Sequence, residues 1–384
     1  MVQAVREGES VRSVARCFGV SHATVLLWVK RARGRRLDRV DWSDRASGSP
    51  RAWNCTTIEV EQKILAVRRS LKDTSALGEY GAQAIAEQLK EEGHVVVPSI
   101  RTIGRVLKRH GVLDRNVRVR RPAPPRGWYL PEVAQRKAEL DSFDVIEDLK
   151  IEDGPLLHVL TGMSLHGRLA VAWPAEAVTA KSILANMLGH WRMWGRPAYA
   201  QFDNDARFHG AHHPDSYGRI QRLCLQIGVT PVFAPPNETG FQAAIESFNG
   251  LWQTKVWQRC RHVDLEHLRK RNALYLEAHR KKTDPCRDGG PSRSNVPADF
   301  ELDLGRRLSG KAIYIRRVGD EGQVKLQGHT YPIEPNWANR LVRCEILFDE
   351  KAVEFFALRR RDPNHQPLLK RANYSVPDKP FIDS

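Results

Sequence analysis

The strongest constraint on the fold is a change of residue periodicity near residue 137. Three short β-like runs come first, and then helix, strand, helix, strand and helix follow in turn. The expected segments are residues 139–146, 156–163, 169–173, 180–194, 198–202, 217–227, 230–233 and 241–260. This succession predicts a central α/β domain over residues 137–262. Several α/β folds share this alternation of strands and helices, so the polar residues are needed to distinguish one fold from another.

Two segments before this domain have helical patterns. Residues 1–37 resemble a helix-turn-helix, in which Gly19-Val20-Ser21 is the turn and Ser21 is placed to cap the second helix. Residues 56–114 contain three helical stretches and a short β-like run at 94–97, which predicts a second, winged helix-turn-helix. Such modules place a helix in the major groove of DNA, whereas an ordinary helical hairpin is the alternative.

The balance of charge agrees with a nucleic-acid partner. The net charge is +16, and most of the excess lies within residues 1–130. A basic protein gains affinity for DNA by releasing counterions from phosphates, although a well-solvated surface has the same composition. The candidate DNA contacts are Ser21, His22, Thr24, Lys30, Arg31, Arg33, Arg101, Arg105, Lys108, Arg118, Arg120, Arg121 and Lys255.

The remaining segments complete a multidomain organisation. Residues 115–136 are basic and rich in proline, as in a semi-rigid linker. Residues 263–310 form a helical and loop-like connector. The period becomes two over residues 311–360, which predicts a small C-terminal β-barrel, and the polar segment 361–384 is expected to be a flexible tail.

Three acidic residues occupy positions that make chemical sense together. Asp141 lies within the first extended run, Asp203 ends a strand, and Glu246 lies one turn into a helix. Carboxylates that converge repel one another unless cations neutralise them, and oxygen ligands suit Mg²⁺ or Mn²⁺. Two such ions can promote an in-line displacement at a phosphate. Asp144 is the alternative to Asp141, on the opposite face of the strand, and Asp141 is preferred here.

These residues resemble the catalytic core of the DDE integrase superfamily, which includes retroviral integrases and bacterial insertion-sequence transposases. The similarity lies in Leu140-Asp141-Ser142, in Phe202-Asp203-Asn204-Asp205 through Phe208, and in Pro235-Pro236-Asn237 through Asn249. It covers about residues 137–260. Asp205 stands where the family usually has Gly, and the Asp203–Glu246 spacing is longer than usual. Lys255 is the cation nearest to Gln253, where many relatives carry Lys or Arg.

The resemblance implies a ribonuclease H-like core and a transposase that binds the terminal repeats of its element. Asp141, Asp203 and Glu246 would bind two Mg²⁺ or Mn²⁺ ions, and the enzyme would cleave a DNA 3′ end and join it to target DNA. A dimer or tetramer on double-stranded DNA is expected, in the bacterial cytoplasm at the nucleoid. The alternatives are a DNA-binding repressor with a silent core and a plain ribonuclease H-like nuclease.

Several other functions are disfavoured. The six cysteines form no CxxC pair, which argues against a zinc ribbon. No apolar run is long enough for a membrane span, and no Gly-rich phosphate loop is present. His209, His212 and His213 are expected to lie in a surface loop, because no partner at zinc-ligand spacing accompanies them.

Overall fold

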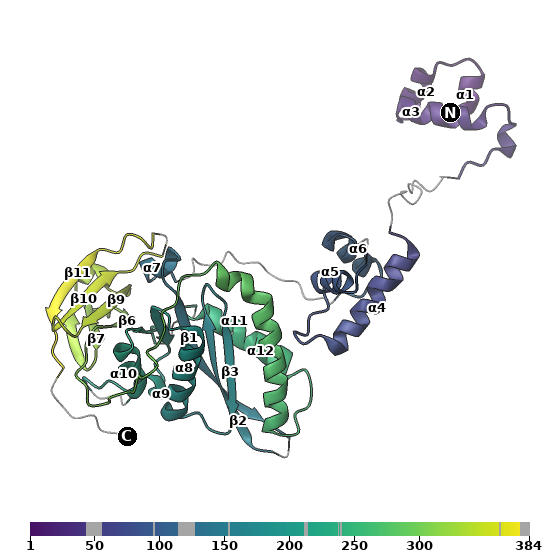
Figure 1. Cartoon of the computed structure of the whole chain (residues 1–384). Helices are drawn as coiled ribbons and strands as arrows, with labels where there is room; N and C mark the ends of the chain where they lie inside the picture. The colour runs from purple at the N-terminus through teal and green to yellow at the C-terminus, as the bar shows by residue number, and fades with distance from the viewer. Residues whose placement is uncertain are drawn as a thin grey trace. The chain divides into compact units, whose positions relative to one another are not determined.

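The chain divides into two compact units, Met1–Glu61 and Gln62–Ser384 (Figure 1). They are described from a computed structural model. The structure describes residues 1–43, 56–94, 97–113, 127–152, 154–210, 214–236, 238, 240–360 and 362–376. Each unit is treated by itself.

The N-terminal unit is made of short helices joined by tight turns. Its helices are α1 (Val2–Arg6), α2 (Val11–Cys17) and α3 (His22–Ala32), followed by the 3₁₀ turn η1 (Leu37–Arg39). Ser21 caps α3 by accepting the backbone N–H of Thr24 at 3.1 Å. The turn needs a left-handed residue, which Gly19 supplies with φ of +63°. Val14 and Val25 are fully buried between α2 and α3.

A second set of helices follows. It consists of α4 (Ile58–Thr74), α5 (Ala82–Glu91) and α6 (Ile100–Arg109). Ile64, Ile85 and Ile103 are fully buried, one from each helix. Ser99 caps α6 by accepting the N–H of Thr102 at 3.2 Å. Of the β-like run expected at 94–97, residues 95 and 96 lie outside the described residues.

A mixed nine-stranded sheet forms the framework of the larger unit, in the order β11-β10-β9-β6-β5-β4-β1-β2-β3. Strands β1, β2 and β3 are antiparallel, β1, β4, β5 and β6 are parallel, and β6, β9, β10 and β11 are again antiparallel. The strands are β1 (Leu140–Lys150), β2 (Leu156–Ser164), β3 (Ala170–Ala175), β4 (Tyr199–Phe202), β5 (Thr230–Phe233), β6 (Lys311–Arg317), β9 (Leu341–Leu347), β10 (Ala352–Ala357) and β11 (Leu368–Asn373). A separate hairpin comprises β7 (Gln323–Leu326) and β8 (His329–Pro332).

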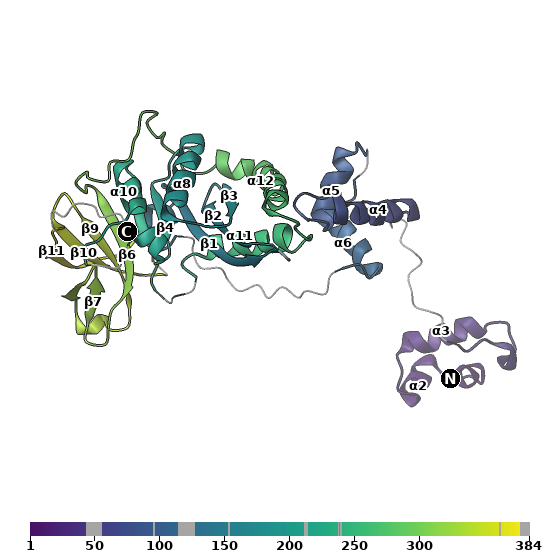
Figure 2. The ribbon, with the colours of Figure 1, turned by 90° about the horizontal axis from the view of Figure 1, so that it is seen from below.

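Helices pack on both faces of the core strands (Figure 2). One face carries α8 (Ala180–Trp194), α9 (Ala206–His209) and α10 (Arg219–Gln226). The other carries α11 (Ala243–Trp252), the π-helical turn η2 (Gln253–Trp257) and α12 (Leu265–Asp288). Short turns α7 (Pro131–Ala134) and η3 (Pro335–Trp337) complete the described elements. Among the described helices, none is both long and apolar enough to cross a membrane.

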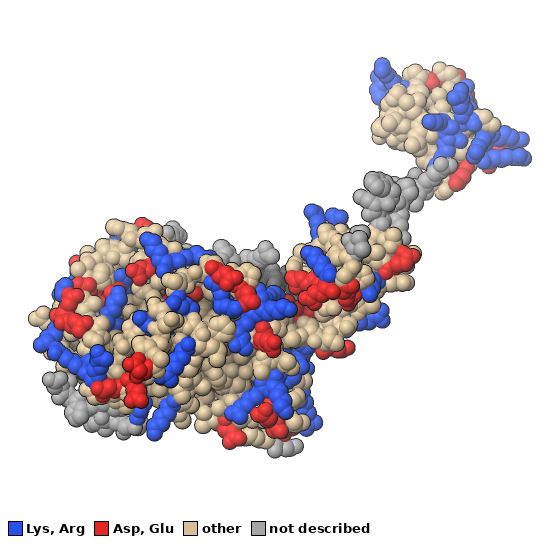
Figure 3. All heavy atoms as spheres, in the orientation of Figure 1, with Lys and Arg blue, Asp and Glu red and all other residues tan. Residues whose placement is uncertain are grey.

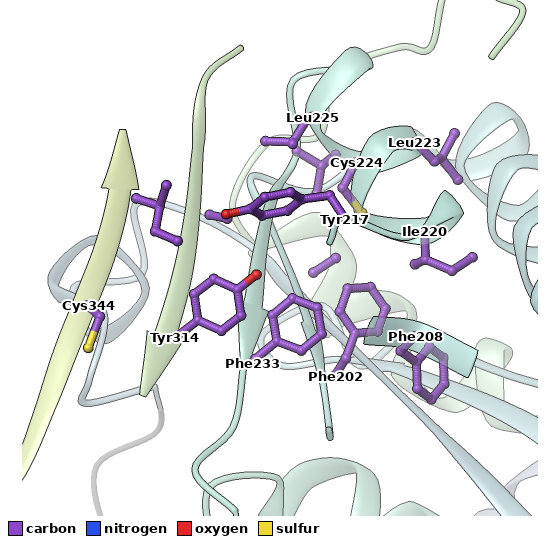
Figure 4. Close-up of a cluster of buried hydrophobic side chains, with 14 of the residues drawn as sticks. Phe202, Phe208, Tyr217, Ile220, Leu223, Cys224, Leu225, Phe233, Tyr314 and Cys344 are labelled. Carbon is purple, nitrogen blue, oxygen red and sulfur yellow. The ribbon is translucent and has the colours of Figure 1, made fainter. Parts of the chain in front are cut away.

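Aromatic side chains join the core strands to the C-terminal strands (Figure 4). The rings of Phe202 and Phe233 lie 5.7 Å apart, and Phe233 stacks on Tyr314 of β6 at 5.0 Å. All three side chains are fully buried. Stacked aromatic pairs add to the stability gained from burial alone, so β6 is bound into the core through this cluster as well as through its backbone.

The C-terminal region differs from the separate β-barrel and flexible tail expected from the sequence. Strand β6 pairs with β5 through Val232–Ile313 and Phe233–Tyr314, so the core sheet continues past residue 311. Residues 368–373, expected in the tail, form β11 and pair with β10. The alternation of polar and apolar residues predicts strands but does not specify their partners, which explains this difference.

Because β6 is shared, the C-terminal strands should unfold together with the core. We expect Ile313→Ala, which empties a fully buried site, to lower the unfolding free energy of the larger unit by about 2–5 kcal/mol. Lys325→Ala on the exposed side of β7 is the control, and surface changes of this kind stay within about 0.5 kcal/mol. Calorimetry of the full chain should show one transition, shifted to lower temperature by Ile313→Ala, in which the core strands and the C-terminal strands unfold together. A separate C-terminal transition that alone responds would contradict this account.

Candidate active site

The pairing of β1 with β4 brings two acidic residues together. In this parallel pair Asp141 lies opposite Ala200 and Ser142 opposite Gln201. Asp144 follows Asp141 by three residues, and Asp203 follows Ala200 by three residues. Because parallel strands advance together, Asp144 and Asp203 become lateral neighbours at the carboxyl end of β4. Such strand ends are where α/β sheets place ligand-binding groups.

The electrostatics of Asp144 show that three acids share this region. The pKa of Asp144 is raised to about 6, chiefly by burial; the like charges of Asp203 and Glu246 also raise it, and hydrogen bonds from Val145 and Asn249 lower it. Burial is also the main cause of the raised pKa of Asp203. Glu246 is exposed in the first turn of α11. Asp203 and Glu246 are thus near enough for their charges to act on Asp144.

Asn249 holds the carboxylate of Asp144 in place. Its amide Nδ2 donates to Asp144 Oδ2 at 2.7 Å, and its Oδ1 accepts from Thr161 Oγ1 at 2.8 Å. Asn249 is buried and lies almost one helical turn after Glu246 on α11. The same helix thus supplies one acid and the residue that orients another.

The segment after Asp203 explains how an aspartate is accommodated at position 205. Asp205 has an extended backbone, with φ of −60°, and caps the short helix α9 by accepting the N–H of Arg207 at 2.7 Å. The guanidinium of Arg207 also donates to Asp205 through Nε at 2.9 Å. Asp205 donates its own N–H to Asp203 Oδ1 at 3.0 Å. No positive φ is required there, so a glycine is unnecessary.

Asp141 lies on the opposite face of β1, against α8. Its side chain is 2% exposed. Arg293 donates to it through both terminal nitrogens, at 2.9 and 2.6 Å, Ser164 Oγ donates at 2.7 Å, and Trp191 Nε1 donates at 3.0 Å. Burial alone would raise the pKa of Asp141, but the charge and hydrogen bonds of Arg293 outweigh it and lower the pKa.

In this arrangement the hydrogen-bonding capacity of the Asp141 carboxylate is used by other groups of the protein. Both of its oxygens accept hydrogen bonds, and a bidentate Arg–carboxylate pair is among the strongest polar contacts in proteins. Asp141 is also separated by the strand from the group formed by Asp144, Asp203 and Glu246. The sequence offered one signal for this difference, the odd spacing of Asp141 and Asp144, but no local pattern reveals a partner as distant as Arg293.

The three acids are not drawn tightly together. In the part of the chain that the structure describes, no three His, Cys, Asp or Glu side chains are close enough to hold a metal ion. Unneutralised carboxylates repel one another, which agrees with an open arrangement. The donor set itself consists of carboxylate oxygens, the ligand type that Mg²⁺ and Mn²⁺ prefer.

The candidate DNA contacts of the first unit lie on α3 and just after it. His22, Lys30 and Arg33 are exposed. The hydroxyls of Ser21 and Thr24 hydrogen-bond to each other at 2.7 Å. Arg31 lies 4.7 Å from the Trp28 ring and donates to the carbonyl of Ser43 at 2.8 Å, so part of its bonding capacity is used within the unit.

In the larger unit, Arg101, Arg105 and Lys108 are exposed on α6. Lys255 is half-buried and donates to the carbonyl of Gly78 at 2.9 Å, which makes it a contact between η2 and the α4–α5 loop. Arg118, Arg120 and Arg121 lie outside the described residues. On the coloured part of the face shown in Figure 3, basic and acidic side chains are interspersed over this unit.

Comparison with known proteins adds two structural likenesses. No protein-family profile and no curated protein match the sequence. A chain of the simian T-cell lymphotropic virus intasome, solved with PP2A regulatory subunit B56 gamma, is 14% identical, with a TM-score of 0.33 over 71% of this chain and 88% of that chain. The catalytic core domain of BIV integrase is 17% identical, with a TM-score of 0.27 over 36% of this chain and 81% of that domain. Both TM-scores lie below 0.5.

Asp144 should make the stability of the metal-free protein depend on pH. Its folded pKa, about 6, exceeds the value of about 3.9 in an unfolded chain, so the folded state binds the proton more tightly. The resulting stabilisation is fully present below the unfolded pKa and is lost as the pH rises through the folded pKa. In EDTA, when the pH rises from about 4 to about 7, we expect the unfolding free energy of wild type to fall by about 1–2 kcal/mol more than that of Asp144→Asn. Urea unfolding at both pH values measures this, and equal losses would contradict it.

Proposed function

We propose that the chain is a metal-dependent DNA phosphoryltransferase of the integrase-like kind, with Asp144, Asp203 and Glu246 as its metal ligands. The observation that carries the proposal is the β1–β4 register, which makes Asp144 the neighbour of Asp203. Glu246 is assigned to the set from α11, because its charge, after burial and the charge of Asp203, contributes to the raised pKa of Asp144. Two carboxylates from adjacent strands and one from a helix form a suitable ligand set for a pair of hard cations.

Asp144 takes the place that the sequence analysis assigned to Asp141. A buried carboxylate that already accepts hydrogen bonds from Arg293, Ser164 and Trp191 has no free lone pairs in the direction of the other acids. Asp144, by contrast, is half-buried, and each of its oxygens accepts one hydrogen bond, Oδ1 from the Val145 N–H at 2.9 Å and Oδ2 from Asn249, so lone pairs remain for a cation. Because Glu246 is exposed, its side chain is free to change rotamer, and in this proposal it turns toward Asp144 and Asp203 when a cation is bound.

The protein's own part in the reaction is to hold the acids and the DNA in position. Asn249 orients Asp144, and the turn after β4 orients Asp203 through the N–H of Asp205. Arg293 and Trp191 fix β1 from its other face. Bound Mg²⁺ or Mn²⁺ would activate a water or 3′-hydroxyl and stabilise the departing oxygen.

The finer assignment is a transposase that binds the ends of a mobile element, cleaves a 3′ end and transfers it to target DNA. Exposed basic residues on α3 and α6 support DNA binding by the helical segments. Two DNA ends require two active sites, so a dimer or tetramer on DNA follows. A repressor with an inactive core and a nuclease that cuts without joining are the outcomes that would replace this assignment.

Substitution of the three acids should separate chemistry from folding. We expect Asp144→Asn, Asp203→Asn and Glu246→Gln each to lower 3′-end cleavage and strand transfer at least about 100-fold. Asn249→Ala should cost about 10–100-fold, because residues that orient metal ligands have effects of this size. Gel assays with labelled duplexes made from the DNA flanking the gene, with Mg²⁺ or Mn²⁺, measure both products. DNA affinity should remain near wild type in the three acid variants, and the activity of every variant is normalised to its folded fraction, because Asn249→Ala also removes buried hydrogen bonds.

Asp141→Asn is the matched comparison on the same strand. It leaves the largely buried guanidinium of Arg293 without its charge partner, so we expect a loss of about 2–4 kcal/mol in unfolding free energy. Activity measured on the fraction that remains folded should exceed that of Asp144→Asn. An active Asp144→Asn enzyme together with a folded but inactive Asp141→Asn enzyme would return the catalytic role to Asp141. Activity in all four acid variants would eliminate the proposed chemistry.

The exposed cations of α6 should contribute to DNA binding through phosphates. We expect the triple variant Arg101→Ala, Arg105→Ala, Lys108→Ala to reduce the slope of log affinity against log salt by about 2–3, because each phosphate contact contributes about 0.9. Lys90→Ala, an exposed cation at the end of α5, serves as the control. Fluorescence anisotropy over a salt series measures the slope, and an unchanged slope in the triple variant would exclude α6 from the interface.

A further inference from the structure

A cavity of about 260 Å³ lies beneath the start of α11, on the same sheet face as Asp144. Ser142 and Gln201 line it, and they precede Asp144 and Asp203 by two residues each. Residues two apart on a strand face the same side and lie about 7 Å apart. Ser247, which follows Glu246, lines the cavity as well. The cavity is therefore next to the three acids and separate from them.

Aromatic and apolar groups form much of the cavity wall. The Phe241 ring lies 5.5 Å from that of Trp128 and 5.3 Å from that of Tyr129. Trp128 and Tyr129 are buried. Phe248 and Leu251 contribute further apolar surface from α11. Such a wall suits a flat, weakly polar group, because ring faces attract other rings in stacked or tilted arrangements.

Two polar atoms in this wall have no hydrogen-bond partner within the described part of the chain. They are Gln242 Nε2, at the start of α11, and His279 Nδ1, on α12. Leaving a buried polar atom without a partner is costly, and proteins rarely do so without a ligand or water to complete the bond. Burial lowers the pKa of His279 to about 4, so its ring is neutral near pH 7 and its tautomer can donate or accept.

We propose that this cavity takes up one unstacked nucleobase from the DNA end whose phosphate lies at Asp144, Asp203 and Glu246. The inference rests on the proposed function. A base offers a flat face for the aromatic wall and edge acceptors for the Gln242 amide. The cavity volume is near the lower limit of about 300 Å³ for ligand pockets, which suits a base without its sugar and phosphate. Arg168, which also lines the cavity, provides a cation for the adjoining backbone.

Photocrosslinking in a catalytically silent background tests this directly. The full-length Glu246→Gln protein is mixed with blunt duplexes made from the gene-flanking DNA, which carry iodouracil at one terminal position or at an internal position. Irradiation followed by mass spectrometry of the peptides locates the base. We expect the terminal label to crosslink to Trp128, Tyr129 or Phe241, and the internal label to give no such product.

Three further variants in the same background separate the cavity from the surrounding DNA surface. Ala244→Phe fills the cavity and should lower the terminal crosslink at least about tenfold. Gln242→Ala removes one donor and should lower it about three- to tenfold. Gln258→Ala, an exposed glutamine at the end of η2 and outside the cavity wall, should leave the yield unchanged. Total DNA affinity should change less than about twofold in Gln242→Ala.

The outcomes distinguish this inference from the proposed function. If the wild-type chain cleaves the duplex but the terminal label crosslinks elsewhere, the cavity does not hold a base and only this inference is overturned. The same conclusion follows if neither Ala244→Phe nor Gln242→Ala lowers the yield. If the wild-type chain neither binds nor cleaves the duplex, both the proposed function and the base site are overturned.

Discussion

The hydrogen-bonded register between β1 and β4 is the constraint on which the site depends. Three residue pairs, from Leu140–Tyr199 to Ser142–Gln201, determine which side chains of the two strands become neighbours. A shift by one residue would move every side chain of β1 to the opposite face and remove Asp144 from Asp203. The register is maintained by apolar residues on both faces, including Phe143 against α8 and Ile146 against the layer of α11 and α12.

The two faces of β1 carry carboxylates with opposite roles. On the α8 side, Asp141 is neutralised by Arg293 and fully hydrogen-bonded, so it joins β1 to the segment after α12. On the α11 side, burial raises the pKa of Asp144, and the charges of Asp203 and Glu246 add to the rise. A buried ion pair satisfies its own charges, whereas a cluster of acids requires cations from solution. This contrast in environment is the physical basis for assigning structure to Asp141 and chemistry to Asp144.

Local sequence patterns predicted much of the core. The expected helix over residues 180–194 and strand over residues 230–233 coincide with α8 and β5, and the β1, β2 and β4 segments were expected to within a few residues. Long-range pairing was beyond such patterns. Nothing near residue 311 indicates that β6 pairs with β5, and nothing near Asp141 indicates Arg293. The choice between Asp141 and Asp144 depended on such distant partners, since both acids occupy one strand and differ only in the face they occupy.

The central claim is that Asp144, Asp203 and Glu246 converge on divalent cations, and anomalous diffraction from crystals soaked in Mn²⁺ tests it most directly. The account predicts manganese peaks bounded by these three carboxylates, with Asp141 still bound to Arg293 on the other face of β1. Manganese coordinated by Asp141, or absent from the three acids at a concentration that supports catalysis, would contradict it.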